Sequence, residues 1–212
     1  DSDVDWYVKK VLAEGKQKYQ ADWALAVVQD VRTGQIVALD DTDQIEAGGD
    51  DAKLNVAKVV NQTFEPGSIG KVVSMAGMLQ SGGSQLTDKF TVPDQINKNG
   101  QVFHDAENHA ADHWTLAGIL QQSSNVGMVM ASGNYSSEQR YDFMTKFGFG
   151  QNSGMGLPGE SSGTLASPQL LDGRTKDTVL FGQGYTVNAL QLTNAVATIA
   201  NKGVRQQQSI IK

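Results

Sequence analysis

The tightest constraint on this fold comes from one segment, Glu65-Pro66-Gly67-Ser68-Ile69-Gly70-Lys71. Pro66 and Gly67 end the preceding loop, and the next residues are apolar enough for a buried helix: Val72, Val73, Met75, Ala76, Met78 and Leu79. Ser68 is therefore expected in the first turn of a helix. Residues three apart share a helix face, so the Lys71 amine can approach the Ser68 oxygen, and free N–H groups at the helix start can stabilise an anion. This is the arrangement of an activated serine.

Lys71 can accept the Ser68 proton only if its amine is neutral when the serine attacks. Burial beside an apolar helix, with another cation near, would lower the pKa of Lys71 towards that condition. A capping serine followed by a solvated lysine gives the same four-residue pattern, so the pair needs support from the rest of the chain.

Length and composition exclude several classes of protein. A chain of 212 residues can bury a substantial core, and we expect one cooperative domain with two lobes. A net charge of −6 without a long basic run argues against nucleic acid as a partner. The absence of cysteine excludes disulfides and thiolate metal sites. No apolar segment approaches the roughly 20 residues that span a bilayer, and the N-terminus is not a signal peptide, as expected of a chain trimmed of its anchor.

Apolar periodicity predicts both helices and strands. Residues 4–19 have helical spacing and are expected to lie against a sheet, which begins with antiparallel strands at 23–30 and 35–39 joined by a short turn. Residues 40–53 are acidic and aperiodic, which predicts an exposed loop. The polar stretch from Ser81 to Asp112 holds one strand-like piece, 89–92.

The second half of the chain is predicted to be mostly helical. Gly148 to Gly163 is expected to be irregular, and the predicted helices are 114–120, 126–131, 137–147 and 188–201.

A second polar pair, Ser123 and Asn125, lies between two of these helices. If the short turn is extended, side chains two residues apart point the same way, which would offer one hydroxyl for proton transfer and one amide for a peptide group. An ordinary turn with a helix cap also produces this pair, so on its own it leaves both interpretations open.

Together, Ser68-x-x-Lys71 and Ser123-x-Asn125 resemble the active-site motifs of penicillin-binding proteins and serine β-lactamases. The resemblance covers Trp23 to Gly203 and is closest to the transpeptidase domain of a class B, monofunctional, cell-division-type penicillin-binding protein. It depends also on Phe64 to Ser68, Gln122 to Gly127, Gly154 to Glu160, Phe181 to Gly184, Leu190 to Leu192 and Ile199 to Gly203.

The resemblance implies a fold and a reaction. The fold is α/β (α+β) of the β-lactamase and transpeptidase type, an antiparallel sheet flanked by helices plus a mostly helical lobe, in one domain over residues 1–212. The reaction is D,D-transpeptidation of peptidoglycan stem peptides through an acyl-enzyme. Ser68 would be the nucleophile, Lys71 its base, Ser123 the proton relay and Asn125 a holder of the substrate amide. β-Lactams would acylate the same Ser68.

The resemblance also suggests partners and a location. Gly184, Tyr185 and Thr186 are candidate substrate-binding residues after a glycine turn. Stem peptides, β-lactams and membrane proteins of division or elongation are the expected partners, on the extracytoplasmic face of a bacterial membrane. We expect no cofactor and no metal, because the spacing of His104, His109 and His113 fits no familiar zinc pattern.

The family's third motif, Lys-Thr/Ser-Gly on a sheet strand, does not occur in the sequence. We therefore expect the chain to be truncated before that strand, with an incomplete sheet and weak or no acylation, since the strand supplies half of the oxyanion hole. Two alternative functions stay open: a serine β-lactamase, and a non-catalytic β-lactam sensor or scaffold domain.

Overall fold

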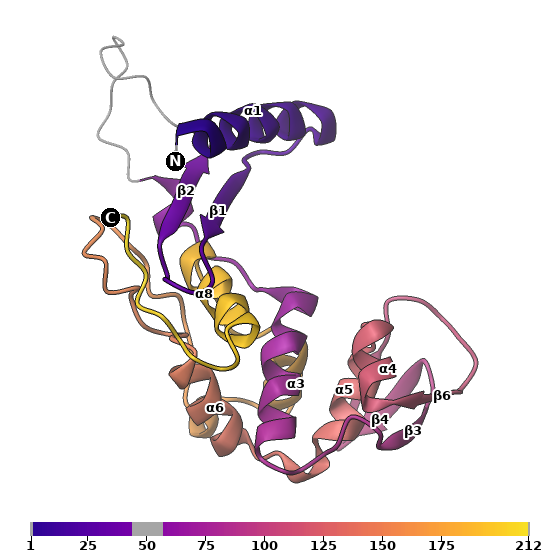
Figure 1. The fold of residues 1–212 in the computed structure, drawn as a ribbon. Helices are drawn as coiled ribbons and strands as arrows, with labels where there is room; N and C mark the ends of the chain where they lie inside the picture. Colours follow the sequence, from indigo (N-terminus) through magenta and orange to yellow (C-terminus); the bar gives the residue numbers. More distant parts are fainter. Residues whose placement is uncertain (1, 44–56, 212) are drawn as a thin grey trace. The chain divides into compact units, whose positions relative to one another are not determined.

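The structure is a computed structural model that describes residues 2–43 and 57–211 (Figure 1). The chain divides into two compact units. Unit 1 comprises residues 1–64, 147–163 and 187–212, and unit 2 comprises residues 65–146 and 164–186. The mixture of helices and antiparallel strands confirms the predicted α/β class. That the two lobes form one cooperative domain over residues 1–212 stays a prediction.

Unit 1 is built on one antiparallel strand pair with helices packed against it. Val27 of one strand pairs with Leu39 of the other, and a bulge falls between Val28 and Gln29. The first helix packs on the second strand and the last helix on the first strand. The elements are α1 (Ser2–Tyr19), β1 (Leu25–Gln29), β2 (Ile36–Asp41), α2 (Lys58–Asn61) and α8 (Ala189–Ala200).

Local sequence explains where α8 begins and ends. Asn188 forms a capping box with Gln191, in which each side chain accepts a hydrogen bond from the other's backbone N–H at 2.8 Å. The apolar side of α8 then joins a core with Leu25, Val27 and Leu39 at its edge: Ile36, Val59, Val60, Ala189 and Leu190. Unit 1 therefore places its core between the strand pair, α2 and α8.

The prediction of an exposed loop from residue 40 is wrong at its start. Asp40 and Asp41 end strand β2, and their exposed fractions are 1% and 6%. Asp41 can be buried because its carboxylate accepts hydrogen bonds from the N–H groups of Val59, in the first turn of α2, and of Asp43. Residues 44–53 of the predicted loop lie outside the described residues.

Unit 2 is the mostly helical lobe, with two small strand pairs. Its helices are α3 (Gly70–Gln80), α4 (Leu116–Gln121), α5 (Asn125–Ala131), α6 (Ser137–Lys146) and α7 (Thr175–Thr178), and its 3₁₀ turns are η1 (Gly67–Ile69), η2 (Ser132–Asn134), η3 (Pro168–Leu170) and η4 (Val179–Phe181). Strands β3 (Lys89–Val92) and β6 (Asp112–Thr115) pair antiparallel, as do β4 (Gln95–Lys98) and β5 (Gln101–His104).

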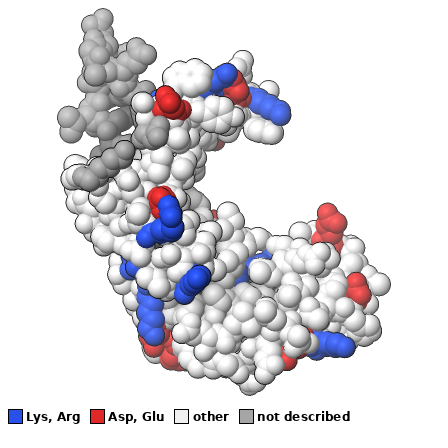
Figure 2. Space-filling model, in the orientation of Figure 1, with Lys and Arg blue, Asp and Glu red and all other residues white. Residues whose placement is uncertain are grey.

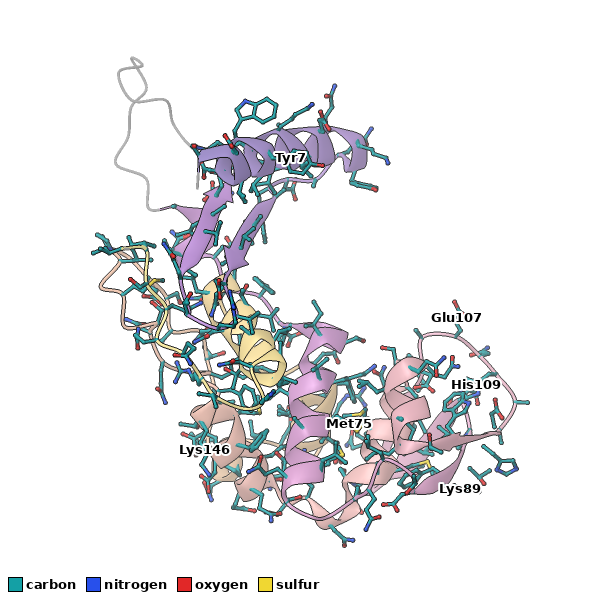
Figure 3. All side chains as sticks on the ribbon, viewed as in Figure 1. Tyr7, Met75, Lys89, Glu107, His109 and Lys146 are labelled. Carbon is teal, nitrogen blue, oxygen red and sulfur yellow. The ribbon has the colours of Figure 1, made fainter. Side chains whose placement is uncertain are left out.

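The core of unit 2 lies between α3, α4, α5 and η4. Met75, labelled in Figure 3, enters it from α3. The other fully buried members come from every neighbouring element and include Met78, Val92, Phe103, Leu116, Ile119, Val126, Met128 and Leu180. This packing fixes the N-terminus of α3 against the turn between α4 and α5.

The prediction of a single strand between Ser81 and Asp112 is also wrong. The stretch contains the β4–β5 hairpin, whose turn residues Asn99 and Gly100 have φ of 53° and 78°. Two positive φ values in an Asn-Gly turn match the right-handed twist of a hairpin, so this dipeptide was the missed signal. Trp114 and Thr115, predicted to be helical, belong to β6, and Thr115 caps α4 by accepting the Gly118 N–H.

The face drawn in Figure 2 carries scattered charges of both signs rather than one extended basic area. Within residues 2–43 and 57–211, no helix combines the length and apolar character needed to cross a bilayer.

Candidate active site

Ser68 lies in the 3₁₀ turn η1, directly before helix α3, as the sequence predicts. The turn rests against backbone: the Gly67 N–H donates to the Gly182 carbonyl oxygen at 2.9 Å. Gly182 has φ of 84°, and a Cβ there would lie 1.8 Å from the Gly67 carbonyl oxygen. Only glycine fits this contact. The Ser68 side chain is left exposed.

Lys71 follows one helical turn later, and its side chain is buried, with an exposed fraction of 1%. Its Nζ lies 3.1 Å from Ser68 Oγ and 3.0 Å from Ser123 Oγ, and it also donates to the Ser123 carbonyl oxygen. The structure thus brings together the three residues that the motifs predict. The hydroxyls of Ser68 and Ser123 face outwards, while the Lys71 amine between them is shielded from water.

Burial lowers the pKa of Lys71 to about 8. The direction and the role of burial agree with the prediction, but no cation among the described residues contributes to the shift. Among the described residues, the charge that acts on Lys71 is the Asp105 carboxylate, which opposes the shift. Roughly a tenth of Lys71 is therefore neutral at pH 7, far more than at an ordinary lysine.

Ser123 does not lie in an extended turn, and that prediction is wrong. Its φ is 55°, in the left-handed region, and Asn125 is already the first residue of α5. The left-handed backbone is what lets both the carbonyl and the hydroxyl of Ser123 reach Lys71. Asn125 donates from Nδ2 to the His104 carbonyl oxygen at 3.2 Å.

These residues border one cavity of about 410 Å³, a size that suits a small-molecule or peptide segment. Ser68, Ser123 and Asn125 line one part of it. The remaining lining comes from the β5–β6 loop and its neighbours: Asp105, Ala106, Glu107, Asn108, His109, Trp114 and Gln122. Figure 3 labels Glu107 and His109 on this loop.

The family is decided by the sequence as a whole. Residues 24–212 match the family model of the penicillin binding protein transpeptidase domain. This chain belongs to that family. The predicted resemblance to class B, cell-division-type members is thereby confirmed.

Relatives of the transpeptidase family match along most of the chain. It is 36% identical to penicillin-binding protein PbpB of Mycobacterium tuberculosis, over 100% of this chain and 32% of that protein. It is 31% identical to peptidoglycan D,D-transpeptidase FtsI of Escherichia coli, over 91% of this chain and 33% of that protein. The chain thus spans about a third of the length of these curated relatives.

Solved structures of the family show the same fold. A peptidoglycan synthetase from Bifidobacterium adolescentis superposes with a TM-score of 0.95 at 56% identity, over 98% of this chain and 38% of that one. Penicillin-binding protein 3 of Mycobacterium tuberculosis, solved with aztreonam, superposes with a TM-score of 0.91 at 35% identity, over 100% of this chain and 48% of that one.

The motifs of this transpeptidase-family chain do not reveal Asp105, although it borders the cavity and is buried. Its carboxylate accepts hydrogen bonds from Ser124 Oγ at 2.7 Å and from the Val126 N–H at 3.0 Å. It also lies 3.1 Å from Nε2 of His109. The only sequence signal was its place one residue after a strand, which requires the missed hairpin to be recognised first.

Gly184, Tyr185 and Thr186 lie apart from this cavity lining. The Gly184 N–H donates to Glu65 Oε1 at 2.7 Å, and the Tyr185 side chain is buried beside Gly70. The Thr186 hydroxyl pairs with that of Thr164 at 2.9 Å. These contacts give the segment a structural role, and its role in substrate binding stays a prediction.

The three histidines do not converge on one point. His104 Nδ1 contacts the Asp105 carbonyl oxygen, His109 contacts Asp105, and His113 Nδ1 contacts Thr91 Oγ1. In the part of the chain that the structure describes, no three metal-ligating side chains gather at one point.

Proposed function

We propose that this chain is the catalytic part of a serine D,D-transpeptidase that cross-links peptidoglycan stem peptides and is acylated by β-lactams. The observation that supports this most strongly is the Lys71 amine, buried and within 3.1 Å of both Ser68 Oγ and Ser123 Oγ. Relatives named D,D-transpeptidase and a relative solved with β-lactams support the same assignment.

The hydrogen bonds of Lys71 suit a base as well as an acid. A protonated amine has three N–H donors, and the three oxygens around Nζ can accept all of them. When the amine is neutral, two N–H groups stay on the Ser123 carbonyl and hydroxyl oxygens. The lone pair is then free for the Ser68 hydroxyl proton. Loss of one proton therefore converts the same contacts into an activated nucleophile.

The acylation step follows from these positions. Ser68 Oγ attacks the carbonyl carbon of the penultimate D-Ala, or of a β-lactam ring, and its proton passes to Lys71 Nζ. The C–N bond of the tetrahedral intermediate then breaks. The leaving nitrogen takes a proton from the Ser123 hydroxyl, which Lys71 replenishes because Nζ lies 3.0 Å from Ser123 Oγ. An amine of a second stem peptide resolves the acyl-enzyme and forms the cross-link.

Asn125 is assigned to the substrate rather than to proton transfer. It borders the same cavity as the two serines, and a side-chain amide can both donate to and accept from a peptide group. Its contact with the His104 carbonyl oxygen fixes the orientation of the amide.

The proposed setting is the extracytoplasmic face of a bacterial membrane. There the chain would act on stem peptides as part of a membrane-anchored protein, together with membrane proteins of division or elongation. The relatives' names refer to peptidoglycan and penicillin, which supports the extracytoplasmic substrate.

Fluorescent penicillin tests the proposal directly. The 212-residue chain is incubated with the label over a long time course, and the adduct is located by mass spectrometry. We expect slow labelling on Ser68, because the sequence contains no Lys-Thr/Ser-Gly triplet to complete the oxyanion hole. Ser68→Ala should abolish the adduct, whereas Ser81→Ala, at the far end of α3, should retain it.

Two results would contradict the proposal. One is a folded wild-type chain that never forms the adduct. The other is an adduct that survives Ser68→Ala. Rapid release of the label as hydrolysed penicillin would instead favour the β-lactamase alternative.

A further inference from the structure

The Ser123 backbone is held in an unfavourable conformation at the centre of the site. A non-glycine residue with φ of 55° persists only where its surroundings fix it. Here the conformation directs two oxygens of one residue, the carbonyl and the hydroxyl, towards Lys71 Nζ. Whatever fixes this turn therefore also fixes the acceptors of the catalytic amine.

Helix α4 fixes the turn on one side. The N–H groups of Ser123 and Ser124 donate to the carbonyl oxygens of Leu120 and Ile119, each at 3.1 Å. These two bonds form a Schellman motif that ends α4, with Ser123 as its left-handed residue. They leave the other side of the turn to be held by different groups.

Asp105 holds that other side with both carboxylate oxygens. Oδ2 accepts the Ser124 hydroxyl at 2.7 Å and Oδ1 accepts the Val126 N–H at 3.0 Å. The Ser124 oxygen in turn accepts the Gly127 N–H at 2.8 Å, which caps α5. Hydrogen bonds to a carboxylate are stronger than those between neutral groups, so this is a firm attachment.

The β5–β6 loop in turn fixes Asp105. His109 Nε2 lies 3.1 Å from Asp105 Oδ2, and the imidazole is 5.1 Å, between ring centroids, from Trp114. Figure 3 shows His109 on this loop. The Asp105 carboxylate thus contacts the β5–β6 loop on one side and the start of α5 on the other. Because the loop holds it in place, it restrains the turn at residues 123–126 instead of moving with that turn.

We propose that Asp105 is a positioning residue for acylation, which pins the turn from Ser123 to Val126 so that Ser123 presents its oxygens to Lys71. The inference rests on the proposed function for its chemical meaning. Asp105 acts through Ser123 and Ser124, and it need not touch Ser68 or the substrate.

Asp105 also acts on Lys71 through its charge, which gives the proposal a distinctive signature. The carboxylate favours protonated Lys71 and so raises its pKa against the effect of burial. Because neutral Lys71 is the active base, the acylation rate rises with pH through the pKa of Lys71. Removing the Asp105 charge should move this rise to lower pH. Loss of the hydrogen bonds from Ser124 and Val126 should separately lower the maximal acylation rate that is reached at high pH.

Other groups near the site define the controls. Ser68 and Ser123 contact Lys71, and His109 faces Asp105 with the charge of Asp94 nearby. His109 can also titrate, so His109→Gln is a control. In this variant the pH at which the acylation rate rises should be unchanged, because Lys71 sets it. Asp142→Asn, on the exposed side of α6, removes one carboxylate elsewhere in unit 2 and should behave as wild type.

The test compares Asp105→Asn with wild type in acylation by fluorescent penicillin at a series of pH values. The acylation rate constant should fall about 10²-fold, as expected for a misplaced catalytic group. The dissociation constant of the first, non-covalent complex should stay the same, and the rise in rate should move to lower pH. A lower rate at every pH without such movement, or an unchanged rate, would overturn the proposal.

Two measurements decide the matter without activity. In ¹³C-lysine-labelled protein, the NMR titration of Lys71 should move to lower pH in Asp105→Asn. Amide hydrogen exchange at Val126 and Gly127 should become faster in Asp105→Ala, which removes both carboxylate oxygens. Unchanged exchange at both amides would refute the attachment. If the wild-type chain is not acylated, the proposed function fails, and these two results still show whether Asp105 holds the turn.

Discussion

Helix α8 of unit 1 and the candidate site of unit 2 bury polar groups of different kinds. On and around α8, unit 1 buries neutral amides, those of Asn188, Gln191, Asn194 and Gln208. Around its candidate site, unit 2 buries the ionisable Lys71 and Asp105. A neutral amide needs only hydrogen-bond partners, whereas a buried ionisable group also changes its affinity for protons. Burial of polar groups is therefore structural around α8 and chemical at the candidate site.

Gln191 shows what the amides do. Its Nε2 donates to the carbonyl oxygens of Gly148, Gln151 and Ser162, at 2.7–3.2 Å. These carbonyls belong to the irregular chain between Phe147 and Gly163, which has neither helix nor strand to satisfy them. One side chain of α8 thus organises a long irregular segment.

The largest predicted effect is the loss of acylation rate in Lys71→Met. Loss of the base should lower the acylation rate by about 10²–10⁴-fold, the usual contribution of general acid–base catalysis. The folded state should be kept, because an apolar side chain replaces a buried amine. Acylation kinetics and denaturant unfolding of the same samples measure both effects. An acylation rate close to wild type would contradict the difference drawn between the units.

The pH dependence of stability should expose the same buried amine. The pKa of Lys71 is about 8 in the folded protein against an ordinary value of 10.5, so the unfolded chain binds more protons between these pH values. Stability therefore rises with pH across this window, by roughly 3 kcal/mol relative to Lys71→Met, which lacks the titration. Urea unfolding of both proteins from pH 7 to about 10.5 measures the difference. A difference that is constant with pH would show that the amine is not buried.

Gln191→Leu probes the structural side of the comparison. Leaving carbonyl oxygens of residues 148–162 without their donor should destabilise the protein by about 1–3 kcal/mol. The cost should be independent of pH, because an amide does not titrate. Denaturant unfolding at two pH values measures it, and Val196→Ala, on the exposed side of α8, is the matched control. A loss of unfolding free energy that changed with pH would contradict a purely structural role for Gln191.

The smallest predicted effect concerns two helix caps, one in each unit. Asn188 caps α8 in unit 1 and Ser124 caps α5 in unit 2, and both are buried. Each change to alanine should cost about 1 kcal/mol of stability. Only Ser124→Ala should also slow acylation, because Ser124 links Asp105 to the Ser123 turn. Equal effects of both changes on the acylation rate would remove that link.

Much of the fold and the three motif residues could be predicted from local sequence. Ser68 and Lys71 share one helix start, so their spacing alone places them together. Strands β1 and β2 and helix α8 follow from short-range periodicity and capping. In each case the signal lies within the element itself or in the residues next to it.

The rest depends on contacts between distant residues, which local patterns do not encode. Asp41 appears solvated in the sequence, and its burial depends on a backbone donor of α2, the Val59 N–H. Asp105 becomes part of the site only because the β4–β5 hairpin delivers it to α5. The conformation of Ser123 likewise follows from what surrounds the turn and not from its own residue type.

The contact between Gly67 and Gly182 limits how this protein can vary. Two backbones meet directly behind Ser68, and any side chain added at Gly182 would collide with the Gly67 carbonyl oxygen. Tolerated sequence changes near the candidate site are therefore expected in the loops and side chains around the cavity.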